Sequence, residues 1–280
     1  MTTDATETDV SRHYTHGGLE AAIREGLAAL GMGPEGLAPA DLAPVDEFHI
    51  GGREATERLA QSLGLKPGMR LLDIGSGIGG AARYFAADHG AEVVGIDLTE
   101  EYVRVASTLA AWVGLSEQVT FRQASALALP FEAATFEAAT MLHVGMNITD
   151  KAALCTEAAR ILVPSGQIGI YDVMQVGDGP LAFPVPWATD EAVSFLAAPD
   201  AYRNALTGAG LEIIAEENRR DYAIAFFERM RARLGGKDGP PPLGLHLLMG
   251  ADAQAKVGNM MRNVEAGLIA PVQIVARKPG

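Results

Sequence analysis

Residues 71–80 read Leu71-Leu72-Asp73-Ile74-Gly75-Ser76-Gly77-Ile78-Gly79-Gly80. The first half is a short apolar run, typical of a buried strand, and the second half is a glycine-rich turn that opens a predicted helix. Gly75 and Gly77 have no Cβ atom, so the backbone can bend tightly there and come close to a ligand. The N-terminus of the following helix favours an electron-rich group. We therefore predict a strand, a turn and a helix that bind a ligand together.

Strands alternate with helices along the chain that follows this turn. We predict strands over residues 70–74, 92–97, 119–122, 135–143, 167–174, 211–214 and 272–276. Strands that alternate with helices of about 10–15 residues form parallel βαβ units, and right-handed crossovers place the helices on both faces of the sheet. The predicted fold class is therefore α/β: a Rossmann-like, doubly wound, mostly parallel seven-stranded sheet whose last pair of strands is antiparallel.

The regions outside this alternating pattern suggest a division of the chain. Residues 1–10 are polar and are predicted to be a disordered leader, and a helical cap follows, so that leader and cap span residues 1–50. Residues 51–280 are predicted to form the ligand-binding domain. Within it, we expect the stretches around 177–200 and 221–267 to be insertions that cover the substrate.

Composition excludes several classes of protein. Of the 280 residues, 48% are apolar and 20% are charged, which excludes a disordered chain, a coiled coil and a disulfide scaffold. The net charge of −13 argues against a nucleic-acid partner, because such proteins neutralise phosphates with Lys and Arg. The single cysteine, Cys155, and six scattered histidines give no metal-ligand spacing. No metal is predicted.

The N-terminal residues are also unlike a signal or transit peptide. No uninterrupted apolar stretch reaches about 18 residues, the length that a membrane span needs. We predict a cytoplasmic protein of enzyme size with a small-molecule partner and no membrane span, and the sequence leaves the oligomeric state open.

Two cofactors compete for the glycine turn. Asp97 ends the second predicted strand, where a carboxylate commonly holds both hydroxyls of a ribose. Gly75, Gly77 and Gly80 satisfy G-x-G-x-x-G, so a nicotinamide or flavin dinucleotide is one candidate, and pure packing of the glycines is a further alternative. Asp73 would face a pyrophosphate with like charge, whereas it suits the ammonium group of S-adenosylmethionine. The residues favour S-adenosylmethionine.

These residues, with the stretch Leu127-Ala128-Leu129-Pro130-Phe131, resemble the class I S-adenosylmethionine-dependent methyltransferases over roughly residues 45–220. Within that superfamily the chain is similar to the small-molecule branch, which contains sarcosine/dimethylglycine N-methyltransferases, sugar O-methyltransferases and UbiE-like quinone C-methyltransferases. The resemblance implies S-adenosylmethionine as cofactor and S-adenosylhomocysteine as product. It implies cofactor contacts from Tyr14, Asp73, Gly75, Ser76, Gly77, Gly79, Asp97, Leu98, Ser125, Ala126, Leu127 and Leu142.

The resemblance assigns roles to two parts of that cofactor site. Ser125, Ala126 and Leu127 follow the third strand and would cover the adenine. Ser125 stands where the family usually has an acidic residue that accepts a hydrogen bond from the adenine amino group, so a hydroxyl here replaces a carboxylate. Tyr14 would reach the carboxylate end of the cofactor.

The resemblance also suggests catalytic and acceptor-binding residues. In related sugar O-methyltransferases, a histidine after the fourth strand works with an aspartate at the end of the fifth, and these positions hold His143 and Asp172. Histidine suits a general base, although His143 could also only shape the pocket. The acceptor would be walled by Met146, Tyr171, Phe183 and Trp187, for which core packing is the alternative.

The sequence thus predicts methyl transfer to a small molecule, with N-methylation of an amine slightly favoured over O- or C-methylation. A dinucleotide-dependent oxidoreductase is disfavoured by Asp73 and by the lack of a Tyr-x-x-x-Lys pair. A non-catalytic protein that retains the cofactor site is the third alternative.

Overall fold

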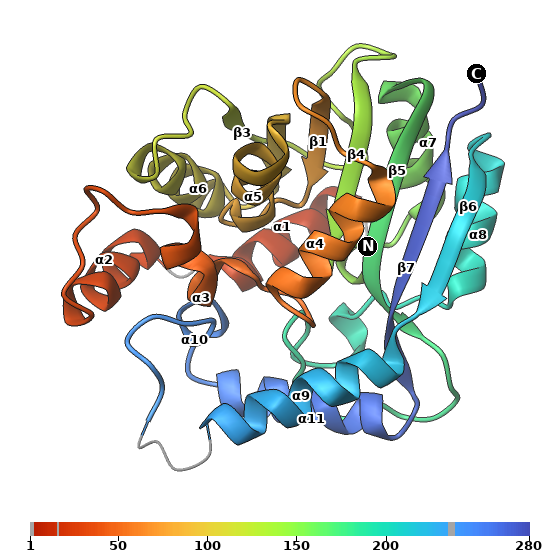
Figure 1. Cartoon of the computed structure of the whole chain (residues 1–280). Helices are drawn as coiled ribbons and strands as arrows, with labels where there is room; N and C mark the ends of the chain where they lie inside the picture. The colour runs from red at the N-terminus through yellow and green to blue at the C-terminus, as the bar shows by residue number, and fades with distance from the viewer. Residues whose placement is uncertain (1–2, 16, 235–238) are drawn as a thin grey trace.

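A single seven-stranded sheet forms the centre of the computed structural model, which describes residues 3–15, 17–234 and 239–280 (Figure 1). The strands lie in the order β3-β2-β1-β4-β5-β7-β6. β1 to β5 are parallel, whereas β7 is antiparallel to both β5 and β6. Their bounds are β1 (Arg70–Ile74), β2 (Glu92–Asp97), β3 (Val119–Gln123), β4 (Phe136–Leu142), β5 (Leu162–Gln175), β6 (Glu212–Asn218) and β7 (Ile269–Arg277). The predicted fold class is confirmed.

Helices cover both faces of the sheet because the central strands are apolar on both sides. In β1, Leu71 packs with α5 (Gly80–His89), whereas its neighbour Leu72 belongs to the cluster formed by α7 (Lys151–Ile161) and α8 (Pro199–Gly208). This difference follows from the alternation of side chains along a strand. α4 (Arg53–Leu63) packs on the α5 face over β5 and β7, and α6 (Glu100–Trp112) lies beside β2 and β3.

The N-terminal region is more helical than the sequence suggested. The predicted disordered leader over residues 1–10 is wrong for its described part, because α1 begins at Thr3 and continues to Tyr14; residues 1–2 lie outside the described chain. α2 (Leu19–Ala29) begins where the backbone N–H groups of residues 17–19 donate to the Glu101 carboxylate, which lies on α6. A short helix, η1 (Pro39–Leu42), and α3 (Ala43–Asp46) complete this region. A domain boundary at residue 50 stays a prediction.

The C-terminal helices lie at one end of the sheet. α9 (Arg220–Leu234) and α11 (Ala253–Glu265) pack against each other at the bottom of Figure 1, with α10 (His246–Met249) between them and α2. Two further short helices, η2 (Gly145–Asn147) and η3 (Glu191–Val193), follow β4 and β5. None of the helices in the described ranges has the length and apolar character that crossing a membrane requires.

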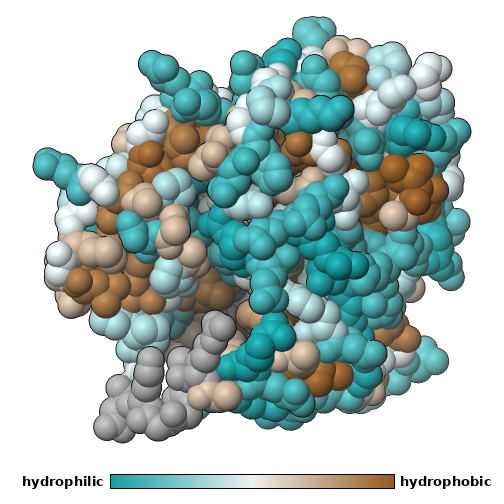
Figure 2. All heavy atoms as spheres, viewed as in Figure 1, coloured by the Kyte–Doolittle hydropathy of each residue, from teal (hydrophilic) through white to brown (hydrophobic). Residues whose placement is uncertain are grey.

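Most large apolar side chains of the described residues are buried. Figure 2 shows hydrophilic residues over the centre of the face on which α4 lies, with separate hydrophobic patches towards its sides. Among the described residues, Leu30 and Ile214 are the large hydrophobic side chains that are clearly exposed. Few large apolar side chains of the described residues are therefore left in contact with solvent.

Candidate functional site

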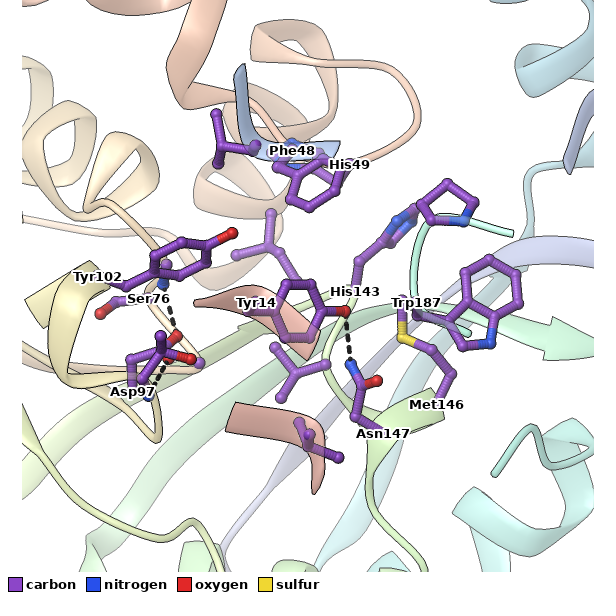
Figure 3. A pocket seen from close by; sticks show the side chains of 18 of the residues that line it. Tyr14, Phe48, His49, Ser76, Asp97, Tyr102, His143, Met146, Asn147 and Trp187 are labelled. Carbon is purple, nitrogen blue, oxygen red and sulfur yellow. Dashed lines mark hydrogen bonds between the residues drawn. The ribbon is translucent and has the colours of Figure 1, made fainter. Parts of the chain in front are cut away.

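A deep pocket lies where the carboxyl ends of β1, β2 and β4 meet. Parallel strands bring these ends to one edge of the sheet, and Asp73 of β1 is paired with Gly95 of β2 and Thr140 of β4. The pocket is lined by the glycine turn, by α1, by the segment before α4, by residues 186–187, and by side chains of the C-terminal helices α9, α10 and α11. Figure 3 shows its two ends, with Ser76, Asp97 and Tyr102 at one and His143, Met146 and Trp187 at the other.

Three of the four glycines of the turn, Gly75, Gly77 and Gly79, do not all have the same role. Gly75 and Gly77 line the pocket with φ of +69° and +55°, a region that L side chains rarely adopt. A Cβ atom on Gly77 would meet nothing within 4 Å, so its exposed side faces open pocket. Gly79 does not line the pocket, because a Cβ atom there would lie 2.4 Å from the Phe121 ring. The predicted cofactor contact of Gly79 is therefore corrected to a packing role at the start of α5.

The carboxylate of Asp97 is held in a fixed position by the backbone. Its Oδ2 accepts the N–H of Gly77 at 2.9 Å, and its Oδ1 accepts the N–H of Thr99 at 2.8 Å. Burial raises the pKa of Asp97, and hydrogen bonds from the Thr99 side chain and the Leu98 backbone to the same carboxylate act in the opposite direction. Two rigid acceptors beside the turn suit the two hydroxyls of a ribose.

Asp73 and Ser76 supply unpaired polar atoms to the same pocket. Thr140 donates to Oδ1 of Asp73 at 2.8 Å, whereas Oδ2 of Asp73 and Oγ of Ser76 are buried without a partner. Burial, with the nearby negative charges of Asp97 and Glu47, raises the pKa of Asp73 to about 7. Buried polar atoms without partners are rare in native proteins, so a ligand with donors fits here. The residues present fit an ammonium group and a ribose on one cofactor.

Tyr14 brings α1 into the centre of the pocket. Its ring lies between the two ends in Figure 3, and its hydroxyl accepts a hydrogen bond from Nδ2 of Asn147 at 3.2 Å. The ring also contacts Tyr102 and the edge of Phe48. Burial raises the pKa of Tyr14, so it remains a neutral phenol.

The loop after β3 differs from what the sequence suggested. Ala126 and Leu127 line the pocket, as do Leu98 after β2 and Leu142 at the end of β4. Ser125 does not line it. Its hydroxyl oxygen accepts the N–H of Leu127 at 3.0 Å, and its proton is donated to Glu7 of α1. The structure therefore places a carboxylate beside the position where the sequence has only a hydroxyl.

His143 lies at the other end of the pocket in an unusual backbone conformation. Its φ is +54°, and its backbone N–H donates to the Tyr171 carbonyl oxygen at 2.8 Å. The imidazole stacks on the Tyr171 ring with centroids 5.3 Å apart, and Nε2 is buried without a partner. Burial, followed by the neighbouring His49, holds the pKa of His143 well below its usual value. The ring is therefore a neutral base at pH 7.

The expected pair of His143 and Asp172 does not form. Oδ2 of Asp172 accepts the hydroxyl of Tyr202 at 2.6 Å, Oδ1 accepts the N–H of Val173, and the side chain does not line the pocket. Burial raises the pKa of Asp172 to about 6. Successive residues of a strand point to opposite faces, and His143 stacks on Tyr171, so Asp172 points to the far side. Asp172 is corrected to a structural residue between β5 and α8.

We expect Asp172→Asn to leave turnover within about threefold of the unchanged protein, because the side chain does not touch the pocket. The thermal midpoint should change instead, since the contact with Tyr202 is altered. Steady-state kinetics and calorimetric melting check the two effects separately. A loss of turnover approaching that of a His143 variant would restore the predicted pair.

Two of the four predicted acceptor residues line the pocket. Met146 and Trp187 do so, and Nε1 of Trp187 donates to Ser194 at 3.0 Å. Tyr171 lies under His143, with its hydroxyl donating to the Ile50 carbonyl oxygen. Phe183 packs against the apolar cluster of α9 and α11 and is not among the pocket residues. Tyr171 and Phe183 are therefore corrected to supporting residues.

His49 and Glu47 line the pocket and were not predicted from the sequence. Nε2 of His49 lies 3.1 Å from the Gly52 carbonyl oxygen, which can only accept, so Nε2 carries the proton and Nδ1 is the basic nitrogen. The ring lies 5.9 Å from that of His143, and burial lowers the pKa of His49 to about 4. Glu47 pairs with Arg53 at 2.7 Å and accepts from Thr56 at 2.8 Å. No hydrophobic periodicity in the sequence identifies His49 or Glu47 as pocket residues.

The far wall of the pocket is apolar and comes from the C-terminal helices. Its residues are Phe226, Phe227, Met230, Leu245, Leu248, Met249, Val257 and Met260. Spacings of three and four place such side chains on one helical face. That periodicity was a signal from which these residues could have been found. No Lys or Arg belongs to the pocket lining in the described ranges, and no group of three or more potential metal ligands occurs there.

The ribose assignment predicts a loss of cofactor affinity in Asp97→Ala. Removing two charged acceptors from a partly desolvated site should cost about 2–3 kcal/mol, or roughly 30–150-fold in Kd for S-adenosylhomocysteine. Isothermal titration calorimetry measures this change, and a melting curve verifies folding. An unchanged Kd in the folded variant would show that the ribose lies elsewhere.

Comparisons with known proteins agree with this geometry. Residues 72–170 match the family described as "Methyltransferase domain". The chain is 28% identical to the 27-O-demethylrifamycin SV methyltransferase of Amycolatopsis mediterranei, over 80% of this chain and 82% of that relative. It is 34% identical to a sterol 24-C-methyltransferase of Gibberella zeae and 31% identical to phosphoethanolamine N-methyltransferase 3 of Arabidopsis thaliana. These two matches cover 41% and 64% of this chain, but only 30% and 36% of the relatives.

A solved structure shows the same fold. Geranyl diphosphate C-methyltransferase from Streptomyces coelicolor A3(2), in complex with Mg²⁺, geranyl diphosphate and S-adenosyl-L-homocysteine, superposes with a TM-score of 0.68 at 18% identity, over 98% of each chain. A methyltransferase domain favours S-adenosylmethionine over a dinucleotide, the two cofactors that the glycine turn left open. Residues 72–170 of this chain match the methyltransferase-domain family, and the whole chain has the fold of a solved methyltransferase.

Proposed function

We propose that this protein transfers the methyl group of S-adenosylmethionine to a hydroxyl group of a largely apolar small molecule. The observation that carries the proposal is a neutral imidazole, that of His143, with an unpaired Nε2 in a pocket whose far wall is apolar. A hydroxyl acceptor needs such a base, because it must lose its proton during transfer.

The charges around the pocket argue against two other acceptor classes. A phosphate-bearing acceptor would need cationic partners, and the described lining contains no Lys or Arg. A cationic amine would need a free carboxylate at the acceptor end. Glu47 is paired with Arg53 there, and Asp172 points away. The sequence slightly favoured an amine, and the relatives include N-, O- and C-methyltransferases, so they do not decide among acceptors.

Each residue of the site has a separate role in the proposed transfer. When bound, S-adenosylmethionine supplies an electrophilic methyl group on a positively charged sulfur. Asp73 holds the ammonium group and Asp97 holds the ribose, so that the reacting groups are placed in line. Nε2 of His143 would accept the hydroxyl proton of the acceptor, so that the acceptor oxygen can take the methyl group that the cofactor would supply. Tyr14 and the C-terminal apolar wall exclude water.

The segments around residues 177–200 and 221–267 are proposed to cover the acceptor. Trp187 comes from the first segment, and Phe226, Phe227 and Met260 come from the second. Aromatic and methionine side chains adapt to apolar ligands of irregular shape. This region is where we expect acceptor specificity to be set.

The proposal is tested with methyl-radiolabelled S-adenosylmethionine and four acceptors: 27-O-demethylrifamycin SV, a sterol, sarcosine and phosphoethanolamine. We expect label in 27-O-demethylrifamycin SV, in the sterol, or in both, and none in phosphoethanolamine. A metabolite extract, fractionated by polarity, extends the test, and the labelled product should be an apolar methyl ether. Label confined to amines would refute hydroxyl transfer, and no transfer with intact S-adenosylhomocysteine binding would support the non-catalytic alternative.

A further inference from the structure

One face of α1 is turned into the cofactor end of the pocket. Glu7, Val10 and Tyr14 all line the pocket, and their spacings of three and four place them on one side of a helix. Tyr14 is fixed by Asn147, and Glu7 is fixed by Ser125 at 2.5 Å. The helix thus contributes a carboxylate to a site that is otherwise built by the strand ends.

The contact with Ser125 fixes only one oxygen of Glu7. Oε1 accepts the proton of the Ser125 hydroxyl, and that hydroxyl oxygen in turn accepts the N–H of Leu127. Within the described chain, no hydrogen bond involves Oε2 of Glu7. Ser125 has donated its proton and is turned out of the pocket lining, whereas Glu7 is part of it. Glu7 of α1, held beside the loop after β3 by Ser125, is therefore the polar group at this corner of the pocket that faces a ligand.

The position of the base follows from the position of the ribose. Asp97 is in register with Gln123 of β3, so a base attached to a ribose at Asp97 reaches the loop that follows β3. There the walls are apolar and come from Leu98, Ala126 and Leu127. Flat apolar walls suit the faces of a purine, and a carboxylate at their edge suits an amino group on its rim.

We infer that Glu7 accepts a hydrogen bond from the 6-amino group of the cofactor's adenine, so that α1 reads the base in place of a carboxylate from the loop after β3. The inference rests on the S-adenosylmethionine site proposed above. A carboxylate accepts hydrogen bonds and donates none, so a 6-oxo purine in the same place would meet it acceptor to acceptor. Glu7 is thereby a residue that determines specificity for the base.

The test compares two ligands by calorimetry: S-adenosylhomocysteine and S-inosylhomocysteine, in which a 6-oxo group replaces the 6-amino group. We expect the unchanged protein to bind the adenosine compound at least about tenfold more tightly. Glu7→Gln should weaken S-adenosylhomocysteine by about tenfold and S-inosylhomocysteine by less than about threefold, because the glutamine amide can donate to the oxo group. The preference for adenine should therefore nearly vanish.

Two further variants serve as controls, one for the change of charge and one for rescue of the preference. Asp9→Asn makes the same charge change on the exposed part of α1, where Asp9 pairs with Arg12, and should leave both affinities unchanged. Adding Ser125→Asp to Glu7→Gln should restore the preference, since it returns a carboxylate to the same corner of the site. Melting curves verify that each variant is folded.

The outcomes separate the two proposals. Failure of the unchanged protein to bind S-adenosylhomocysteine would overturn the cofactor site itself. Binding without preference between the two ligands, or an equal preference in Glu7→Gln, would overturn the role of Glu7 and leave the cofactor site standing.

Discussion

Gly77→Val should abolish measurable binding of S-adenosylhomocysteine while the protein remains folded. The space beside Gly77 is open, with nothing within 4 Å of a Cβ atom, and it faces the pocket where the cofactor backbone contact is expected. A branched side chain there fills the ligand's place and also adopts a φ of +55° at a cost. We expect a loss of at least about 1,000-fold in affinity, measured by calorimetry.

Gly64→Val is the matched control for backbone strain. Gly64 has a φ of +59° and also has nothing within 4 Å of a Cβ atom, but it ends α4 and does not line the pocket. Both variants should lower the thermal midpoint by similar amounts, whereas only Gly77→Val should lose the ligand. Retained binding in Gly77→Val would place the cofactor away from the turn.

His143→Ala should lower turnover by about 10²–10⁴-fold and leave the affinity for S-adenosylhomocysteine nearly intact. The reason is that Nε2 of His143 is the proton acceptor in the proposed hydroxyl transfer, and its unpaired state in the pocket leaves it free for the acceptor. Single-turnover measurements separate the chemical step from cofactor binding. A drop of about tenfold or less would indicate that positioning carries the rate, as expected for an amine or carbon acceptor.

The pH profile gives an independent test of the same residue. A base works only when unprotonated, so turnover should fall when acid protonates the ring. Because burial holds the pKa of His143 well below its usual value, the fall should begin below pH 6.5 when S-adenosylmethionine is saturating, since a bound ammonium group then keeps Asp73 ionised. The groups around the ring are His49 and Tyr171. His49→Asn should raise the pKa of His143, and move the acid limb to higher pH with it, because the charge that His49 takes up in acid lowers that pKa. A limb centred above pH 6.5 would contradict the assignment.

The strand–turn–helix unit could be predicted because its demands are local. Gly75 and Gly77 need positive φ, Asp97 closes the turn through the Gly77 N–H, and each of these contacts joins residues near in sequence or at adjacent strand ends. The apolar runs of the strands likewise identify the sheet, since strands buried on both faces read as continuous hydrophobic stretches.

The acceptor end could not be predicted in the same way. His143 adopts a φ of +54°, which is rare for a non-glycine residue and turns its ring onto Tyr171. No residue pattern around His143 in the sequence predicts this positive φ. The predicted pairing with Asp172 assumed a shared face of the sheet, and the alternation of side chains along β5 separates them.

Local patterns were sufficient to predict the sheet, the order of its strands in the chain, and the residues that meet at the carboxyl ends of β1 and β2. They were sufficient because hydrophobic periodicity and backbone conformation are properties of neighbouring residues. The distant groups that complete the site became visible in the folded chain alone. Glu7 lies 118 positions from Ser125, and the packing of α1 over the pocket brings them together. Helix packing depends on the shapes of both surfaces at once, and so no local pattern could show that contact.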